Sequence, residues 1–189
     1  MLTVFIDFKS PASYLAMNPV LALAERCQVA VDWKPFRTVE RAIPTVTDNA
    51  SVAQMHRKVR AASRRAIHQK YAAHQGIALR FPEPPGNTDL ALGVLTMIDG
   101  DRLSFIQAAF AAYWTDHADL NDAAVLSALM SGTVQKGFDL DRQVVLDVLE
   151  TSQMQAEEKG VVEAPAFFIQ DQLFIGREHL PWIEEIIRA

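Results

Sequence analysis

The chain has almost no cysteine. Cys27 is the single cysteine among 189 residues, so no disulfide can form within the chain. It falls in the apolar end of a predicted helix, where a free cysteine is usually a small buried hydrophobe. Without a Cys-x-x-Cys pair the chain cannot carry out dithiol–disulfide exchange. The sparse cysteine suits a reducing compartment, and we expect a cytoplasmic protein.

Long hydrophobic runs are also missing. No uncharged stretch approaches the roughly 18 residues that a membrane-spanning helix requires. The first residues, Met1-Leu2-Thr3-Val4, run directly into a predicted strand, which is not the pattern of a signal peptide. The formal net charge of −5 gives no global reason to expect nucleic acid. We expect no membrane, nucleic-acid or metal partner.

Acidic residues are absent from residues 49–82, and this stretch carries seven basic side chains instead. Within it, apolar residues recur at helical spacing over residues 51–75, from Val52 and Met55 to Val59, which predicts an amphipathic helix. A basic stretch of this kind is usually the solvated face of a helix. The alternative is that Arg57 binds a carboxylate of a substrate.

The remaining pattern changes along the chain. At the N-terminal end it predicts a strand over 2–8, a helix from Ser10 to about 27 and a strand over 29–36. The middle predicts helices over 51–75, 87–98, 101–114, 121–130 and 139–159, with Tyr113 and Trp114 as core residues. The C-terminal end predicts strands over 166–170 and 173–175, a turn at 171–172 and a helix over 179–188.

The order βαβ, helical block, ββα predicts an α/β protein with a thioredoxin fold. Residues 1–36 and 160–189 would form the thioredoxin-like domain, and residues 37–159 an all-helical domain inserted between its two halves. In such a fold the reactive group lies at the N-terminus of the first helix. Here Ser10-Pro11-Ala12-Ser13 occupies that place.

Ser10 allows two interpretations. A serine before a proline is an ordinary helix start, since the hydroxyl caps the helix and proline suits its first position. The free N–H groups and the helix dipole also make this end a binding site for an anion, and Lys9 adds a cation beside it. We expect Ser10 to be the catalytic residue, with its hydroxyl orienting and activating the thiolate of bound glutathione.

Pro165 precedes the late strand and is the second predicted element of the site. In a thioredoxin fold the corresponding peptide bond is cis and turns the preceding backbone toward the start of the helix. Ala164 would then offer its N–H and C=O to a peptide-like ligand, as an added β-strand does. Glutathione is such a ligand, and we expect Ala164 and Pro165 to contact it.

The third predicted element comprises Ile175, Gly176, Arg177 and Glu178, which lead into the last helix. Backbone amides and Arg177 could hold the γ-glutamyl carboxylate of glutathione, and Glu178 could accept from its α-amino group. The alternative is an exposed turn with surface charges.

These motifs resemble those of the 2-hydroxychromene-2-carboxylate isomerase family, relatives of kappa-class glutathione transferases in the DsbA-like thioredoxin superfamily. The resemblance lies in DFKSPASYLA (7–16), FPEPPGNTDLAL (81–92), FAAYWTDHADLNDAAVL (110–126), EKGVVEAPAFFI (158–169) and LFIGREHL (173–180). It implies that Ser10 holds the glutathione sulfur, that Ala164 binds the glutathione backbone and that residues 175–178 bind its γ-glutamyl end. It also implies a homodimer.

We therefore expect a glutathione-dependent isomerase of an aromatic enone or chromene carboxylate. Lys9, Arg37 and Arg57 are the candidates to bind the carboxylate of this small-molecule substrate. One alternative is a kappa-like glutathione transferase, which would use the same thiolate but leave the sulfur on the product. Another is a non-catalytic binding protein with this fold, in which Glu163, Arg177 and Glu178 have abolished glutathione binding.

Overall fold

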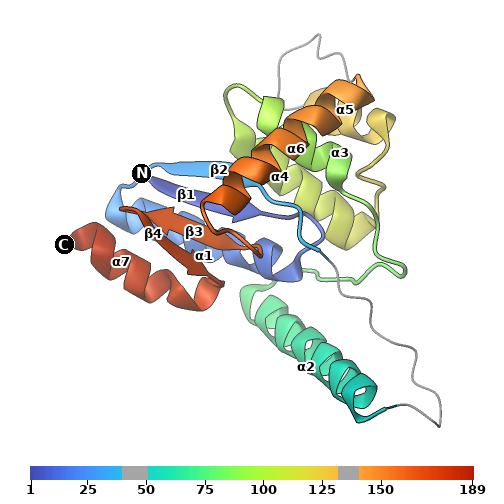
Figure 1. Ribbon diagram of the computed structural model, residues 1–189, viewed down its shortest axis with the longest axis horizontal. Helices are drawn as coiled ribbons and strands as arrows, with labels where there is room; N and C mark the ends of the chain where they lie inside the picture. The colour runs from blue at the N-terminus through green and yellow to red at the C-terminus, as the bar shows by residue number, and fades with distance from the viewer. Residues whose placement is uncertain (40–50, 132–140) are drawn as a thin grey trace. The chain divides into compact units, whose positions relative to one another are not determined.

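The computed structural model describes residues 1–39, 51–131 and 141–189, and it begins with a βαβ unit (Figure 1). β1 (Leu2–Ile6) is followed by α1 (Pro11–Cys27) and β2 (Val31–Pro35). The two strands are parallel, with Leu2 opposite Val31 and Ile6 opposite Pro35. The carboxyl ends of β1 and β2 therefore lie side by side, at the edge from which α1 starts.

The C-terminal residues complete the sheet. β3 (Ala166–Ile169) and β4 (Gln172–Ile175) form an antiparallel hairpin, and β3 also runs antiparallel to β1. The strand order is β2-β1-β3-β4, and a 3-10 turn, η2 (Arg177–His179), leads into α7 (Leu180–Arg188). This order confirms the predicted thioredoxin fold, with the helical block between its halves.

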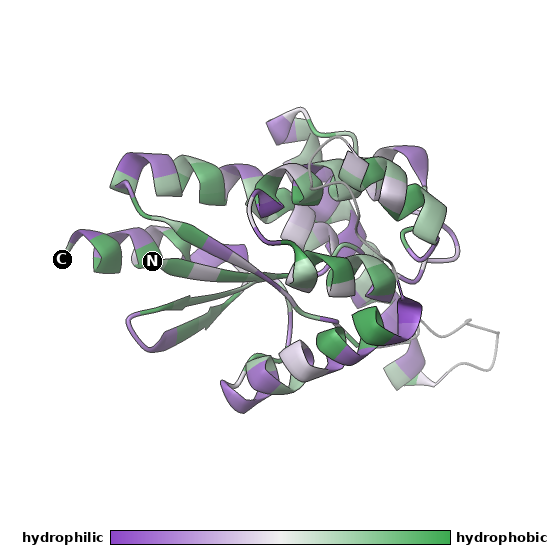
Figure 2. Cartoon of the chain, turned by 90° about the horizontal axis from the view of Figure 1, so that it is seen from above, coloured by the Kyte–Doolittle hydropathy of each residue, from purple (hydrophilic) through white to green (hydrophobic). Residues whose placement is uncertain are grey.

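Helices cover both faces of the sheet. Side chains alternate between these two faces along each strand. Phe5 and Ala166 lie opposite each other and pack with Ala156 in one hydrophobic cluster. Val4 and Phe167 face the other way and are fully buried. α1 and α7 pack against each other on this second side, away from α6 (Figures 1 and 2). Figure 2 also shows that the strands are mostly hydrophobic and that the turn between β3 and β4 is hydrophilic.

The helical block follows the predicted order. It contains α3 (Asp89–Met97), α4 (Arg102–Ala111), a π-helical turn η1 (Ala112–Asp116), α5 (Ala123–Ser131) and α6 (Arg142–Glu158). α3 and α6 approach closely at Gly93, where a Cβ atom would overlap Val145. This packing fixes the positions of α3 and α6 relative to each other, beside the carboxyl ends of β1 and β2.

The residues group into two compact units, Met1–Thr38 with Arg80–Ala189, and Val39–Leu79. The helices from α3 to α6 thus belong to the same unit as the sheet. The domain boundaries expected near residues 37 and 159 stay a prediction.

The second unit contains α2 (Val52–Gln75). Its start is a capping box, in which the Ser51 hydroxyl accepts from the Gln54 N–H and the Gln54 side chain accepts from the Ser51 N–H. The predicted helix is confirmed, but its apolar stripe is exposed. Val52, Met55 and Val59 have 72%, 52% and 65% of their surface accessible. Spacing alone predicted the stripe but not whether other residues cover it.

Several boundaries differ from the prediction; the first strand, for example, ends at Ile6 and not at residue 8. The turn between β3 and β4 is made by Gln170 and Asp171, both with positive φ, so β4 starts one residue earlier than expected. The helix predicted over 101–114 changes at Ala112 to the wider π-helical turn. The last helix of the block is capped by Asp141, whereas the predicted start at Asp139 lies outside the described residues.

Candidate functional site

Ser10 lies where the chain leaves β1 and enters α1. Its backbone is extended and its Oγ accepts a hydrogen bond from the Ser13 N–H at 3.2 Å, so it caps the helix as predicted. The same hydroxyl donates to the backbone carbonyl of Ala164 at 3.0 Å. The two residues are 154 positions apart in the chain. Ser10 therefore joins the start of α1 to the loop that precedes β3.

The Ala164–Pro165 peptide bond is cis, as expected. Ala164 is buried in the hydrophobic cluster beneath this loop, while Val162 and Glu163 just before it are exposed. The carbonyl of Pro165 accepts from the Gly176 N–H at 2.9 Å. One chain of hydrogen bonds thus connects all three predicted elements of the site.

Gly176 has a positive φ of 96°, in the region that favours glycine. The carboxylate of Glu178 folds back against it and occupies the space that a Cβ atom at Gly176 would take. Arg177 and Glu178 form a single 3-10 turn before α7, and Ile175 packs against the hydrophobic cluster. The turn presents one carboxylate at the position predicted for the γ-glutamyl end of the ligand.

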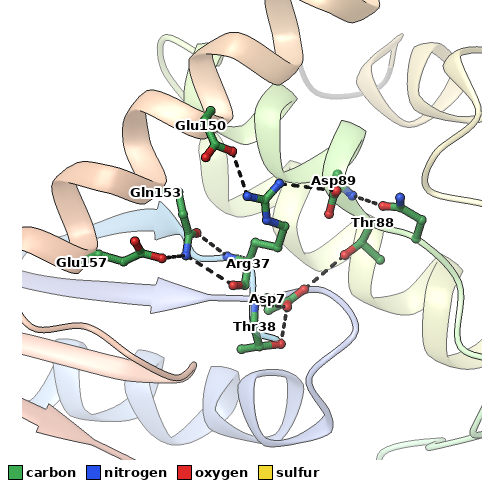
Figure 3. A network of polar contacts seen from close by, with 9 residues as sticks. Asp7, Arg37, Thr38, Thr88, Asp89, Glu150, Gln153 and Glu157 are labelled. Atoms are coloured by element: carbon green, nitrogen blue, oxygen red, sulfur yellow. Dashed lines mark hydrogen bonds and ion pairs between the residues drawn. The ribbon is translucent and has the colours of Figure 1, made fainter. Parts of the chain in front are cut away.

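Asp7 was missed by sequence reasoning, which treated it as part of the first strand. The side chain is fully buried and lies directly after β1. Its carboxylate accepts from the Thr38 N–H and from the hydroxyls of Thr38 and Thr88 (Figure 3). It also accepts from the backbone N–H of Lys9. Burial raises its pKa, although the hydrogen bonds from Thr38 and the charge of Lys9 oppose this. The only sequence signal was an acid at the end of an apolar strand.

The candidates for binding a substrate carboxylate have different surroundings. Lys9 is partly buried next to Ser10 and makes no ion pair with a described residue. Arg37 pairs with Glu150 at 2.8 Å and with Asp89 at 3.7 Å (Figure 3). Burial opposes the charged form, but these two carboxylates outweigh it and raise the pKa of Arg37. Arg57 is an exposed residue of α2, in the other compact unit.

An aromatic cluster supports the turn before Ser10. The buried indole of Trp114 donates from Nε1 to the carbonyl of Phe8 at 2.9 Å. Tyr14, one helical turn after Ser10, stacks on Phe110 with ring centroids 5.1 Å apart, and burial raises its pKa. Tyr113 and Trp114 each expose 2% of their surface, which confirms the predicted core packing.

Across residues 1–39, 51–131 and 141–189, no helix is long and apolar enough to cross a membrane. In the same ranges, no three or more His, Cys, Asp or Glu side chains are grouped so that they could hold a metal ion.

Comparison with known proteins gives a consistent result. Residues 1–188 match the family model of the DSBA-like thioredoxin domain. The chain is 24% identical over 193 residues to a 2-hydroxychromene-2-carboxylate isomerase of Sphingobium xenophagum, covering 97% of this chain and 95% of that protein.

Solved structures show the same fold. The structure of selenomethionine 2-hydroxychromene-2-carboxylate isomerase has a TM-score of 0.74 at 17% identity, covering 99% of this chain and 94% of that one. The cytosolic disulfide reductase DsbM of Pseudomonas aeruginosa, solved with GSH, has a TM-score of 0.59 at 13% identity, covering 100% and 99% of the two chains.

Proposed function

Because the chain belongs to the DsbA-like thioredoxin family, we propose that its Ser10 site binds glutathione and isomerises an aromatic enone or chromene carboxylate. The relative from Sphingobium xenophagum is named as such an isomerase, and the match covers nearly the whole length of both chains. GSH is also the ligand named for the DsbM structure.

The observation that carries this proposal is the hydrogen bond from Ser10 to Ala164. This bond brings together a hydroxyl, the N-terminus of α1 and the backbone before Pro165. Neither Ser10 nor Ser13 carries sulfur. The groups suited to holding a thiolate and an extended peptide are therefore present, but the thiolate must come from the ligand. This excludes the disulfide exchange of Cys-x-x-Cys proteins and favours a glutathione-dependent reaction.

Ligand binding would change the partner of the Ser10 hydroxyl. In the structure, this hydroxyl donates to the carbonyl of Ala164. When glutathione binds, the hydroxyl would donate to its sulfur, and the released carbonyl would accept an N–H of the tripeptide, as an added strand does. A hydrogen bond to the anion and the positive end of α1 both favour the thiolate over the thiol, whose pKa is otherwise near 8.5.

The chemistry follows from the thiolate. Its sulfur adds to an electron-poor carbon of the substrate, and the electron pair moves onto the conjugated carbonyl. The former double bond can then rotate, or the ring can open. When the electron pair returns, the carbon–sulfur bond breaks and glutathione leaves unchanged. The protein contributes positioning of the two reactants and stabilisation of the charges that develop.

Lys9 is the better placed of the predicted cations to bind the substrate carboxylate. It follows Asp7 in the turn that leads to Ser10 and makes no ion pair with the described residues. Arg37 is already held between Glu150 and Asp89, so binding a substrate would require it to leave one of them. Since the ligand is a thiol, a reducing cytoplasm is the location that fits this proposal.

Replacement of Ser10 by alanine tests the proposal. Turnover of 2-hydroxychromene-2-carboxylate by Ser10→Ala at neutral pH should fall about tenfold or more, because less of the bound glutathione is ionised. Turnover should recover as the pH is raised, since the thiol then ionises without help. The fold should be retained, which circular dichroism and thermal melting would check.

Ser104→Ala is a matched control. Within the described part of the chain its hydroxyl donates only to Asp101, the cap of α4, so turnover by this variant should equal that of the wild type. Equal activity of Ser10→Ala and the wild type at neutral pH would contradict the role of Ser10. Calorimetric titration with millimolar glutathione tests binding separately from turnover.

The turn at Gly176 favours one alternative. The Glu178 carboxylate lies where the γ-glutamyl end of glutathione is expected, which is what a non-catalytic protein that no longer binds glutathione would show. An absence of binding heat and of any melting shift with glutathione would establish that alternative. If glutathione binds, the mass of the product distinguishes an isomerase from a transferase, because only the transferase product retains the tripeptide.

A further inference from the structure

Among the described residues, every hydrogen bond of the Asp7 carboxylate comes from a donor. Oδ1 accepts from the Lys9 N–H at 3.2 Å and from the Thr88 hydroxyl at 3.1 Å. Oδ2 accepts from the Thr38 N–H at 2.8 Å and from the Thr38 hydroxyl at 2.5 Å. Four donors saturate the two oxygens, which is the coordination of an ionised carboxylate.

An ionised carboxylate in this position is costly. Asp7 is fully buried, and among the described residues no cation lies within ion-pair distance of it. Burying a charge without an ion pair is unfavourable, and here the four hydrogen bonds are what offset it. A side chain whose only task was to fill space would be apolar.

A neutral amide of the same shape could not replace it. The two backbone donors, from Lys9 and Thr38, point at different oxygens. Backbone N–H groups cannot turn round to accept, as hydroxyls can. In Asp7→Asn the NH₂ group would therefore face one of these N–H groups and leave it unsatisfied. The turn therefore requires an acceptor at both oxygen positions, which a carboxylate supplies and an amide does not.

Asp7 also holds the backbone of the turn that carries Ser10. Its carbonyl accepts from the Ser10 N–H at 3.0 Å, and its N–H donates to the buried hydroxyl of Ser13 at 3.3 Å. Ser13 in turn donates its N–H to Oγ of Ser10. Backbone and side chain of Asp7 thus fix the residues on both sides of Ser10, from Lys9 to Ser13.

We propose that Asp7 is a positioning residue, whose carboxylate ties Lys9, Thr38 and Thr88 together so that the Ser10 hydroxyl is aimed at the thiolate of bound glutathione. This inference rests on the proposed function of Ser10. It goes beyond that function because it assigns the orientation of the hydroxyl to a buried charge that does not touch the ligand.

Two effects of Asp7 on the ligand have opposite signs. As a nearby negative charge alone, the carboxylate would disfavour a thiolate, and its removal would lower the pKa of the bound thiol. As a positioning residue it favours the thiolate through Ser10, and its removal would raise that pKa. The direction of the change therefore decides between a positioning role and a purely electrostatic one.

The test measures the ionisation of bound glutathione by the ultraviolet absorbance of its thiolate, during a pH titration without substrate. The variants are Asp7→Asn, Ser10→Ala and the double variant. For Asp7→Asn we expect the thiol pKa to rise by about one unit, a tenfold loss of thiolate at a given pH. The double variant should match Ser10→Ala, since Asp7 acts through Ser10.

Thr88→Val serves if Asp7→Asn does not fold. It removes one donor to the carboxylate and keeps the shape of the side chain, so a smaller rise of the same thiol pKa is expected. Asp101→Ala is the control for a general loss of stability. It removes the cap of α4 but no contact of the Ser10 turn, and its thiol pKa should equal that of the wild type.

The outcomes separate this inference from the function on which it rests. No thiolate absorbance in the wild type overturns the proposed function, and this inference with it. A wild-type signal that is unchanged or shifted to lower pH in Asp7→Asn and Thr88→Val overturns the inference alone. Additive effects of Asp7→Asn and Ser10→Ala also overturn it, because Asp7 would then act independently of the hydroxyl.

Discussion

At the residue scale, Trp114 of the helical block supports the turn that precedes Ser10. Its indole is buried, donates to the carbonyl of Phe8 and lies parallel to the ring of Tyr14. Trp114→Phe keeps an aromatic ring but leaves the carbonyl without its donor, which should lower the free energy of unfolding by about 1–3 kcal/mol.

Urea denaturation measures this loss. Trp182→Phe is the control, since the Trp182 side chain is 56% exposed and its replacement should change stability by no more than about 0.5 kcal/mol. Equal losses in the two variants would show that the hydrogen bond to Phe8 contributes nothing.

Glu178 gives a second test at this scale. If its carboxylate accepts from the α-amino group of glutathione, Glu178→Gln removes a charge-assisted hydrogen bond. The dissociation constant for glutathione should then rise about tenfold, corresponding to about 1.4 kcal/mol. Calorimetric titration measures this, with Glu185→Gln as the control because it removes another exposed acid, on α7. Tighter binding by Glu178→Gln would instead show that the carboxylate blocks the site.

The pH dependence of stability tests the buried state of Asp7. Its pKa is raised in the folded protein from 3.8, so the folded state binds a proton more tightly than the unfolded state does. Between the two pKa values the folded state holds more protons, and stability falls as the pH rises through this window. Relative to Asp7→Asn, the wild type should therefore gain stability as the pH is lowered from the folded-state pKa of Asp7 to its unfolded-state pKa. Urea denaturation at a series of pH values measures the difference, and a constant difference contradicts it.

Local sequence placed part of the site but not all of it. Ser10, Pro165 and Gly176 have local sequence signals: a helix start, a proline before a strand and a glycine before a helix. In the structure, hydrogen bonds connect the three segments. Asp7 has no such local signal. Its meaning comes from Thr38 and Thr88, which only the folded chain brings to it.

At the element scale, the contact between α3 and α6 depends on Gly93. A methyl group there would overlap both the side chain and the backbone of Val145, so the two helices would have to move apart. Gly93→Ala should cost about 1–3 kcal/mol by overpacking, although alanine is the better helix former. Thermal or urea denaturation would measure the loss. An equal or more stable variant would show that the helices separate without cost.

Periodicity and capping residues predicted most elements correctly, and their ends less well. Asp101 starts α4 and Ser51 starts α2, because each side chain caps its own helix. The π-helical turn at Ala112 had no signal in the spacing of apolar residues. The turn of Gln170 and Asp171 was placed one residue late, since several polar residues there could adopt the positive φ that it needs.

At the scale of the whole molecule, we propose that the chain forms a homodimer through the exposed stripe of α2. The stripe, formed by Val52, Met55 and Val59, is flanked by basic residues, and stretch 49–82 has no acid. The rest of the chain carries eleven basic residues against all twenty-three acidic ones. The basic side chains beside the stripe could therefore pair with acidic residues that a second copy carries outside stretch 49–82.

The double variant Met55→Gln with Val59→Gln tests this surface. Loss of two apolar side chains from an interface should raise the dimer dissociation constant about tenfold or more, which analytical ultracentrifugation can measure. Val144→Gln is the control, because Val144 is an exposed valine of α6. A wild-type monomer at all concentrations, or a double variant that dimerises as the wild type does, contradicts the proposal.

The serines at positions 10 and 13 also determine how the site responds to oxidation by peroxide. A thiol at a helix start oxidises readily to sulfenic acid and beyond, whereas a hydroxyl does not. The reactive sulfur of the proposed enzyme would arrive afresh with each tripeptide and depart with it. Oxidative stress would then deplete the supply of that tripeptide and leave the catalytic groups of the polypeptide intact.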